Sequence, residues 1–246
     1  MSGGLDRLRG AYAPAFKFHE ENLAMLSWYV ERMIRAVTET GARHLVSMGI
    51  GHGVVAQAIL RGLADRLERY TIVEGSAAMV EEFRARVPLP PQVRLVNSRF
   101  EDYAPDHAVD ALEMGFVLEH VDDPPLLLDR FAALLRPGGR LIVVVPNARS
   151  LHRLLGHAAG LLDDVYQLSP HDLELGHLRY FDLDSIRALV TGAGLRIVRS
   201  EGVFLKVLPT DMLGRLELPA SVARAFFEVG VPYPEIANAI YLETTR

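Results

Sequence analysis

The stretch Leu45-Val46-Ser47-Met48-Gly49-Ile50-Gly51-His52-Gly53 decides the fold of this 246-residue chain. An apolar run leads into three glycines at alternate positions, and the small apolar residues of 54–60 follow directly. This order predicts a buried strand, a glycine-rich turn and a helix that begins right after the turn. Glycine permits positive φ and a close approach of a ligand to the backbone. Because the first N–H groups of the helix are also free, we expect a ligand at this turn.

The spacing of the glycines separates two kinds of nucleotide site. A dinucleotide site has the pattern G-x-G-x-x-G, whereas this chain has G-x-G-x-G and Val54 occupies the position of the dinucleotide glycine. The next predicted strand ends in Glu74, roughly 20 residues after Gly53, where an acid can accept hydrogen bonds from ribose hydroxyls. We expect a nucleoside-containing ligand on Glu74, and a purely structural glycine turn is the alternative.

Composition excludes several classes of function. The formal net charge is −5 and there is no cysteine, so neither a nucleic-acid partner nor a disulfide or thiolate site is expected. The N-terminus lacks the charged-then-apolar pattern of a signal peptide. No apolar run is long enough to span a bilayer, so we expect a cytoplasmic protein without a membrane partner.

Strands and helices alternate from residue 44 onward. This alternation predicts an α/β fold with a doubly wound, mostly parallel sheet and helices on both of its faces. The predicted strands are 44–48, 70–74, 93–96, 108–114, 140–145, 195–205 and 236–244. The predicted helices are 20–40, 53–66, 77–86, 124–135, 151–162, 183–191 and 219–228.

Two segments fall outside the alternation. Residues 12–19 are rich in aromatics and precede an amphipathic helix, so they form either a packing strap or a lid with Tyr12, Phe16 or His19 facing the site. Residues 150–180 are expected to form a cap inserted after the fifth strand. A single domain over 1–246 is expected, consisting of a lid and helix (1–42), a cofactor-binding core (44–147), the cap (150–180) and the rest of the sheet (181–246).

Further motifs carry a family resemblance. The chain reads FVLEHVDDP over 116–124, LLRPGGRLIVVVPN over 134–147, RSLHRLL over 149–155 and GHLRYF over 176–181. Together with the glycine motif, these residues resemble the class I S-adenosylmethionine (SAM) dependent methyltransferases, in particular a bacterial branch that acts on small molecules. The resemblance covers roughly 44–207.

The resemblance implies a fold, a cofactor and a set of contacts. It implies a Rossmann-like seven-stranded sheet whose last strand is antiparallel, with SAM across the carboxyl ends of the strands. It implies methyl transfer to an O or N atom of a small-molecule acceptor, in bacterial specialised metabolism, and leaves a homodimer open. The implied cofactor-binding residues are Tyr12, Gly49, Gly51, Gly53, Glu74, Gly75, Ser76, Phe100, Glu101, Met114, Gly115 and Phe116.

Two departures from the family pattern leave alternatives open. Ser47 stands where relatives usually have an acid that helps hold the methionine amine, and Gly115-Phe116 replaces a more polar pair. A SAM-binding protein without catalysis is therefore one alternative. A nucleotide-cofactor oxidoreductase is another, although the missing third glycine and the absence of a Tyr-x-x-x-Lys pair disfavour it.

Histidines are the candidates for catalysis. Placement of the acceptor supplies most of the rate in methyl transfer, and a hydroxyl or amine acceptor must also lose a proton. We expect His177 and His120 to be the catalytic candidates, with His171 and His19 behind them. No metal is expected, because relatives that use Mg²⁺ bind it through carboxylates after the fourth strand, where this chain has Gly115-Phe116.

Overall fold

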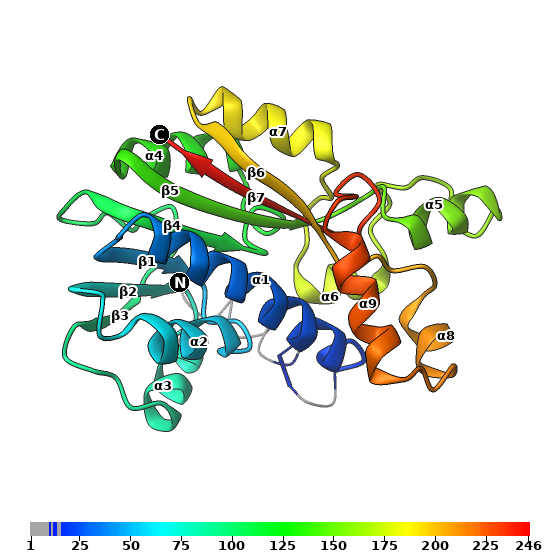
Figure 1. Ribbon diagram of the computed structural model, residues 1–246, viewed down its shortest axis with the longest axis horizontal. Coiled ribbons are helices and arrows are strands. Elements are labelled where there is room, and N and C mark those ends of the chain that lie inside the picture. Colours follow the sequence, from blue (N-terminus) through cyan, green and yellow to red (C-terminus); the bar gives the residue numbers. More distant parts are fainter. Residues whose placement is uncertain (1–9, 11, 14–15) are drawn as a thin grey trace.

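All strands of the described chain belong to one sheet. The computed structural model describes residues 10, 12–13 and 16–246 (Figure 1). The strands are β1 (His44–Met48), β2 (Arg69–Glu74), β3 (Val93–Asn97), β4 (Val109–Gly115), β5 (Leu135–Pro146), β6 (Arg196–Val203) and β7 (Ala239–Thr245). They form a seven-stranded sheet in the order β3-β2-β1-β4-β5-β7-β6.

The direction of the strands agrees with the prediction. Neighbouring strands from β3 to β5 pair in parallel, and β7 runs antiparallel to both β5 and β6. The Rossmann-like sheet with an antiparallel last strand is therefore confirmed. One consequence for the site is that the ends of β1, β2 and β4 lie at the same edge.

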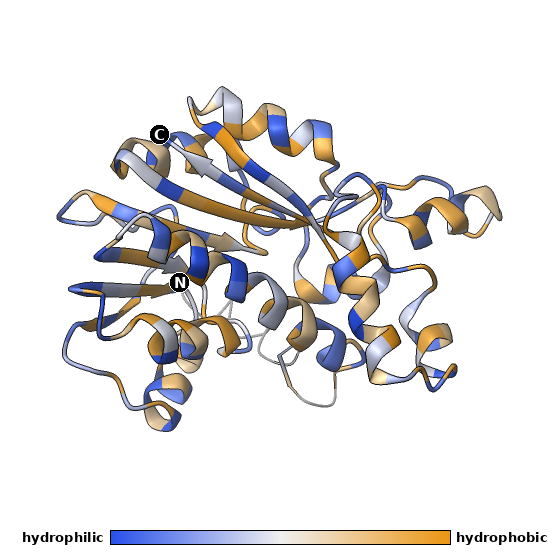
Figure 2. Ribbon diagram, viewed as in Figure 1, coloured by the Kyte–Doolittle hydropathy of each residue, from blue (hydrophilic) through white to orange (hydrophobic). Residues whose placement is uncertain are grey.

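Helices cover both faces of this sheet. They are α1 (His19–Glu39), α2 (Val54–Leu63), α3 (Ala77–Arg86), α4 (Pro124–Leu134), α5 (Leu151–Ala158), α6 (Pro170–Leu175), α7 (Leu183–Gly192), α8 (Thr210–Gly214) and α9 (Ala220–Gly230). Buried residues of α1, α2 and α3 join one core cluster, and those of α4 and α7 join the cluster on the other face. Figure 2 shows the matching pattern, with largely hydrophobic central strands and helices that carry both kinds of residue.

Several predicted helix starts coincide with side-chain caps. The Ser76 hydroxyl accepts a hydrogen bond from the backbone N–H of Met79 at the start of α3. Asp123 caps α4 in the same way, with Pro124 in its first turn. Asp182 and Ser185 form a reciprocal capping box at the start of α7. Because these caps satisfy otherwise unpaired N–H groups, they fix where each helix begins.

The structure differs from the sequence expectation in short elements. The short helices α6 and α8 were not predicted, because one or two turns carry too little periodicity. The predicted strand 140–145 begins earlier in the structure, because β5 already starts at Leu135 and includes Pro137-Gly138-Gly139. The pairing with β4 is irregular there, and Gly138 has φ of +80°. None of the described helices is both long and apolar enough to cross a membrane.

Candidate active site

A cavity of about 790 Å³ opens at the carboxyl ends of the parallel strands. The turns after β1, β2, β4 and β5 line it, together with residues of α1, the cap and the segment around Lys206. Open parallel sheets bind ligands at this edge, and ligand pockets commonly measure about 300–1,000 Å³. The cavity is therefore large enough for a nucleoside-containing ligand and a second small molecule.

The glycine turn forms one wall of the cavity. Gly49, Gly51 and Gly53 have φ values of +92°, +50° and +74°, in the region that L side chains rarely adopt. Gly49 and Gly51 line the cavity, whereas Gly53 is the N-cap of α2 and does not. A Cβ built on Gly53 would lie 3.2 Å from the Phe83 ring, so this glycine allows close packing of the turn on α3.

Glu74 lies beside the glycine turn at the end of β2. Its Oε2 accepts a hydrogen bond from the N–H of Ile50 at 2.9 Å, and its Oε1 accepts one from the N–H of Ser76 at 2.8 Å. A carboxylate offers about four lone-pair sites, so Glu74 can accept from several donors at once, including a ligand hydroxyl. Gly75 lines the cavity as expected, whereas Ser76 does not line it and instead caps α3.

Aromatic residues close the cavity around the glycine turn. Phe100 and Glu101 line the wall next to Glu74, and the Phe100 ring would lie 3.8 Å from a Cβ on Gly49. Tyr12 lines the cavity from the N-terminal segment and packs edge-on against the His52 ring at 5.2 Å. Burial raises the pKa of the Tyr12 hydroxyl well above its ordinary value, so this group stays protonated.

The N-terminal segment was expected to place Tyr12, Phe16 or His19 at the site. Tyr12 lines the cavity, and so does Phe18, but Phe16 and His19 do not. The Phe16 ring packs on Phe18 and on His171, at centroid distances of 5.8 and 6.3 Å. Other parts of the expected lid, residues 1–9, 11 and 14–15, lie outside the described residues.

The end of β4 differs from the expectation in one residue. Gly115 and Phe116 line the cavity, but Met114 belongs to the buried cluster on the opposite face of the sheet. Successive side chains of a strand point to opposite faces. The strand residue that faces the cavity beside Gly115 is therefore Glu113, which the sequence analysis did not single out.

Glu113 is a buried carboxylate in the cavity wall. Its Oε1 accepts hydrogen bonds from the Tyr29 hydroxyl at 2.9 Å and from the Gly115 N–H at 2.7 Å. Burial raises the pKa of Glu113 to about 7, although the hydrogen bonds from Tyr29, Gly115 and Ser47 oppose this effect. A small change of environment can therefore ionise this carboxyl near neutral pH.

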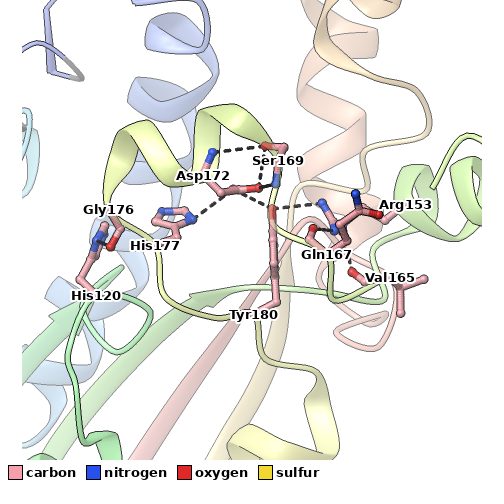
Figure 3. A network of polar contacts seen from close by, with 9 residues as sticks. All are labelled: His120, Arg153, Val165, Gln167, Ser169, Asp172, Gly176, His177 and Tyr180. Atoms are coloured by element: carbon pink, nitrogen blue, oxygen red, sulfur yellow. Dashed lines mark hydrogen bonds and ion pairs between the residues drawn. The ribbon is translucent and has the colours of Figure 1, made fainter. Parts of the chain in front are cut away.

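Two histidines from distant parts of the sequence meet in the wall of the cavity (Figure 3). The rings of His120 and His177 contact each other edge-to-face, with centroids 4.8 Å apart. His120 Nδ1 lies 3.2 Å from the carbonyl oxygen of Gly176, and His177 Nδ1 lies 3.1 Å from Asp172 Oδ1. The structure thus brings together both predicted catalytic histidines.

A polar network in the cap holds His177 in place (Figure 3). Asp172 Oδ1 also accepts from the Tyr180 hydroxyl at 2.9 Å, and Tyr180 in turn contacts the Arg153 guanidinium. Burial raises the pKa of Asp172, but hydrogen bonds from His177 and Ser169 outweigh it and hold that pKa well below the usual range. An ionised Asp172 therefore accepts a hydrogen bond from His177 when Nδ1 of the ring carries the proton.

The remaining expectations concern metal ligands and two further histidines. Glu119 forms a cluster of possible ligand atoms with the two histidines, and the expectation that no metal is bound stays a prediction. His171 lines the cavity, but its Nδ1 lies 3.2 Å from Glu174 and pairs with that carboxylate.

Lys206 also lines the cavity. Its Nζ donates hydrogen bonds to Glu21 and to Thr210, each at 2.7 Å.

Known proteins resemble part of this chain. Trans-aconitate 2-methyltransferase from Enterobacter sp. (strain 638) is 32% identical over 103 residues, which cover 42% of this chain and 39% of that protein. Ubiquinone biosynthesis O-methyltransferase from Xylella fastidiosa (strain M23) is 29% identical over 138 residues, covering 55% of this chain and 53% of that protein. The chain thus matches about half or less of the length of these curated relatives.

A solved structure and a known family extend the likeness. The plantazolicin methyltransferase BamL, solved with a triazolic desmethylPZN analog and SAH, superposes with a TM-score of 0.63 at 12% identity. That alignment covers 98% of this chain and 90% of the other, and it shows a shared fold. The family described as a methyltransferase domain matches residues 24–200, well over half of the chain. The resemblance inferred from the motifs is therefore confirmed, and this chain belongs to the methyltransferase domain family.

Proposed function

We propose that this protein transfers a methyl group from SAM to an O or N atom of a small-molecule acceptor. The observation that carries the proposal is that one cavity is lined by two chemically different groups of residues. The glycine turn, Glu74 and Glu113 form one group, which we call the donor end, and His120 and His177 form the other, which we call the acceptor end. When bound, SAM supplies an electrophilic methyl group on its sulfonium centre.

The donor end fits the adenosine part of SAM. Glu74 is held by two backbone N–H groups and can accept hydrogen bonds from ribose hydroxyls. Phe100 supplies an apolar surface for the adenine, and Glu101 lies next to it in the cavity wall. Gly49 and Gly51 let the ligand approach the backbone, because a side chain at either position would require strained φ values.

The donor end also contains a counter-charge for the amino group of SAM. Ser47 cannot provide it, but Glu113 on the neighbouring strand lies in the cavity wall. A buried ammonium group is stable only when it is paired and hydrogen-bonded. We assign this pairing to Glu113. Ser47 in place of the usual acid is then a weaker argument for a SAM-binding protein without catalysis.

The acceptor end is suited to hold a hydroxyl or amine. Methyl transfer from a sulfonium needs the acceptor atom in line with the methyl group, so accurate placement accounts for most of the acceleration. The lone pairs of His120 and His177 can accept the hydrogen of such an acceptor group. We therefore keep both residues as the catalytic candidates, with Asp172 as the residue that positions His177.

The acceptor is proposed to be a small molecule with an apolar or ring portion, in the setting of bacterial specialised metabolism. The cavity is partly enclosed by aromatic residues such as Tyr12, Phe18 and Phe116. The formal net charge of −5 does not favour a nucleic acid as the acceptor. The names of the two curated relatives also refer to small acceptors.

Incubation with SAM labelled in its methyl group tests this function. The protein is mixed with pooled hydroxyl- and amine-containing small molecules, and mass spectrometry follows the label and the formation of S-adenosylhomocysteine. We expect a labelled product from at least one pool, and no product from the Glu74→Gln variant at limiting SAM. Binding of SAM without S-adenosylhomocysteine formation from any pool would support the non-catalytic alternative instead.

A further inference from the structure

Three residues at the acceptor end form a cluster that can bind a cation. Glu119 and His120 follow β4, and His177 follows α6 in the cap. One donor atom from each of the three lies within 4.8 Å of the other two. Metal-bound nitrogen and oxygen atoms lie about 2.0–2.2 Å from Zn²⁺, so modest side-chain rotations would bring all three onto one ion.

Hydrogen bonds already fix the tautomers of both histidines. The carbonyl of Gly176 can only accept, so the ring nitrogen of His120 that faces it, Nδ1, must carry a proton. Asp172 Oδ1, which also accepts from the Tyr180 hydroxyl, faces Nδ1 of His177 in the same way, so this nitrogen is the donor as well. Nε2 is therefore the nitrogen of each ring that is available to a cation. Metal-binding histidines are commonly held in this way, with the other ring nitrogen donating to a carbonyl or carboxylate.

The carboxylate of Glu119 provides a second, independent observation. Its side chain is 0% exposed, and neither of its oxygens has a hydrogen-bond partner among the described residues. A buried carboxylate without partners carries a large desolvation cost unless a positive charge lies beside it. A divalent cation held between Glu119 and the two histidines would supply that charge.

We propose that Glu119, His120 and His177 bind a divalent transition-metal cation of the Zn²⁺ or Fe²⁺ type. Two imidazoles with one carboxylate suit such cations better than Mg²⁺ or Ca²⁺, which prefer oxygen ligands throughout. Three protein ligands leave at least one coordination position open. Because His120 and His177 line the cavity, that position faces the space assigned to the acceptor.

The cation has a clear use in the proposed reaction, and this part of the inference rests on the proposed function. A bound cation lowers the pKa of an oxygen ligand and orients it. An acceptor hydroxyl in the open position then loses its proton to solvent. Its oxygen forms the new O–C bond with a lone pair while the C–S bond breaks, and the electron pair of that bond remains on sulfur. In this form the two histidines act by holding the cation rather than as proton acceptors.

Titration with Co²⁺ tests the site without SAM or any acceptor. The untagged, chelator-treated protein is titrated while visible d–d absorption is recorded, and Zn²⁺ is then added as a competitor. We expect one equivalent of Co²⁺ to bind and Zn²⁺ to displace it. Glu119→Gln and His177→Gln should each weaken Co²⁺ binding by at least about 10–100-fold. That is the loss usually seen when a residue that only supports a metal ligand is replaced.

His157→Gln is the matched control, because His157 lies in α5, outside the cluster, and contacts the Leu162 carbonyl. This variant should bind Co²⁺ like the wild type, and melting curves check that every variant is folded. Absence of the band in the wild type, or a band that persists in folded Glu119→Gln and His177→Gln, would overturn the proposal. X-ray absorption of the wild-type Co²⁺ complex gives a test without variants, since fewer than two imidazole ligands would also overturn it.

The metal site and the proposed reaction can fail separately. Calorimetry with SAM on chelator-treated protein tests the donor end alone, because Glu74 and Glu113 are not part of the cluster. Binding of Co²⁺ in a protein that does not bind SAM would retain the metal site and contradict the methyl-transfer function. Methyl transfer at an undiminished rate in a chelated protein, with no Co²⁺ band, would contradict the metal site alone.

Discussion

Ser47 and Glu113 are directly paired positions on the adjacent parallel strands β1 and β4. Paired positions in a sheet present their side chains on the same face, and Ser47 is among the groups that oppose the rise in the pKa of Glu113. Tyr70 donates to the Ser47 oxygen at 3.1 Å, and Tyr29 donates directly to Glu113. The carboxylate that the glycine-motif strand lacks is thus present one strand away, in the same layer of the site.

The first prediction follows from this pairing. Glu113 has a pKa raised to about 7, chiefly by burial, and the ammonium group of SAM would favour its ionised form. Affinity for SAM should therefore fall as the pH is lowered below 7, by up to about tenfold per unit, and binding should release protons in that range. Calorimetry between pH 5.5 and about 8.5, in buffers of different ionisation enthalpy, measures both effects.

Glu113→Gln is the variant that isolates this group. It should weaken SAM binding by about 1.5–3 kcal/mol, as for other hydrogen bonds to a charged partner, and remove the pH dependence below neutrality. Asp129→Asn, on the surface helix α4, is the control and should leave both properties unchanged. An unchanged pH dependence in Glu113→Gln would show that another group pairs with the amine.

A second prediction concerns Glu74. Glu74→Gln should weaken SAM binding by about 2–3 kcal/mol, because the ribose hydroxyls lose a charged acceptor. Glu81→Gln is the control, since Glu81 is exposed on α3 and pairs with Arg84. Equal affinities of Glu74→Gln and the wild type would remove Glu74 from the donor end. Melting curves without ligand separate this effect from loss of the bonds that Glu74 makes to Ile50 and Ser76.

A third prediction concerns His177. His177→Ala should lower kcat by about 10²–10⁴-fold, whether the residue takes the acceptor proton or holds a cation. Its affinity for SAM should barely change, because His177 is not among the residues assigned to the donor end. His171→Ala should have a much smaller effect on kcat, since His171 pairs with Glu174 instead of joining the cluster. A normal kcat with a raised KM for the acceptor would reduce His177 to a residue that anchors the cap.

A fourth prediction tests the packing at the end of β4. A Cβ at Gly115 would lie 2.2 Å from the Tyr29 hydroxyl and 2.6 Å from Glu113 Oε1. Gly115→Ala should therefore destabilise the fold by about 1–3 kcal/mol, as over-packing does, and weaken SAM binding as well. Gly192→Ala on α7 is the control, because nothing lies within 4 Å of its added Cβ.

The crowded contact also predicts a rescue. Tyr29→Phe removes the hydroxyl that the new methyl group would meet, so the double variant should recover part of the stability lost in Gly115→Ala. Denaturant unfolding measures both variants. If the stability losses of Gly115→Ala and Tyr29→Phe simply add in the double variant, the clash with the Tyr29 hydroxyl is not the cause of the loss in Gly115→Ala.

Much of the fold was predictable because its signals are local. The glycine turn, Glu74 at the end of β2 and the capped starts of α3 and α7 depend on residues close together in the sequence. The antiparallel β7 came from the family resemblance and is confirmed by its pairing with β5.

The site residues that were missed depend on side-chain direction or distant contacts. Met114 is the predicted residue at the end of β4, but Glu113 is the one that lines the cavity. Side chains alternate between the two faces of a strand, so Glu113 shares a face with Gly115 and could have been identified on that basis. Glu119 gave no separate signal, because it acquires its meaning only when the cap brings His177 beside His120. The contact of Asp172 with His177 likewise depends on α6, which was not predicted.

A crystal structure of the S-adenosylhomocysteine complex tests the central claim most directly, namely that one cavity has a donor end and an acceptor end. The account predicts ribose hydroxyls on Glu74, the amino group on Glu113 and the sulfur facing the side of the cavity that holds His120 and His177. Adenosine bound elsewhere, or an amino group that contacts neither Glu113 nor its neighbours while the sulfur faces away from the two histidines, would contradict the account.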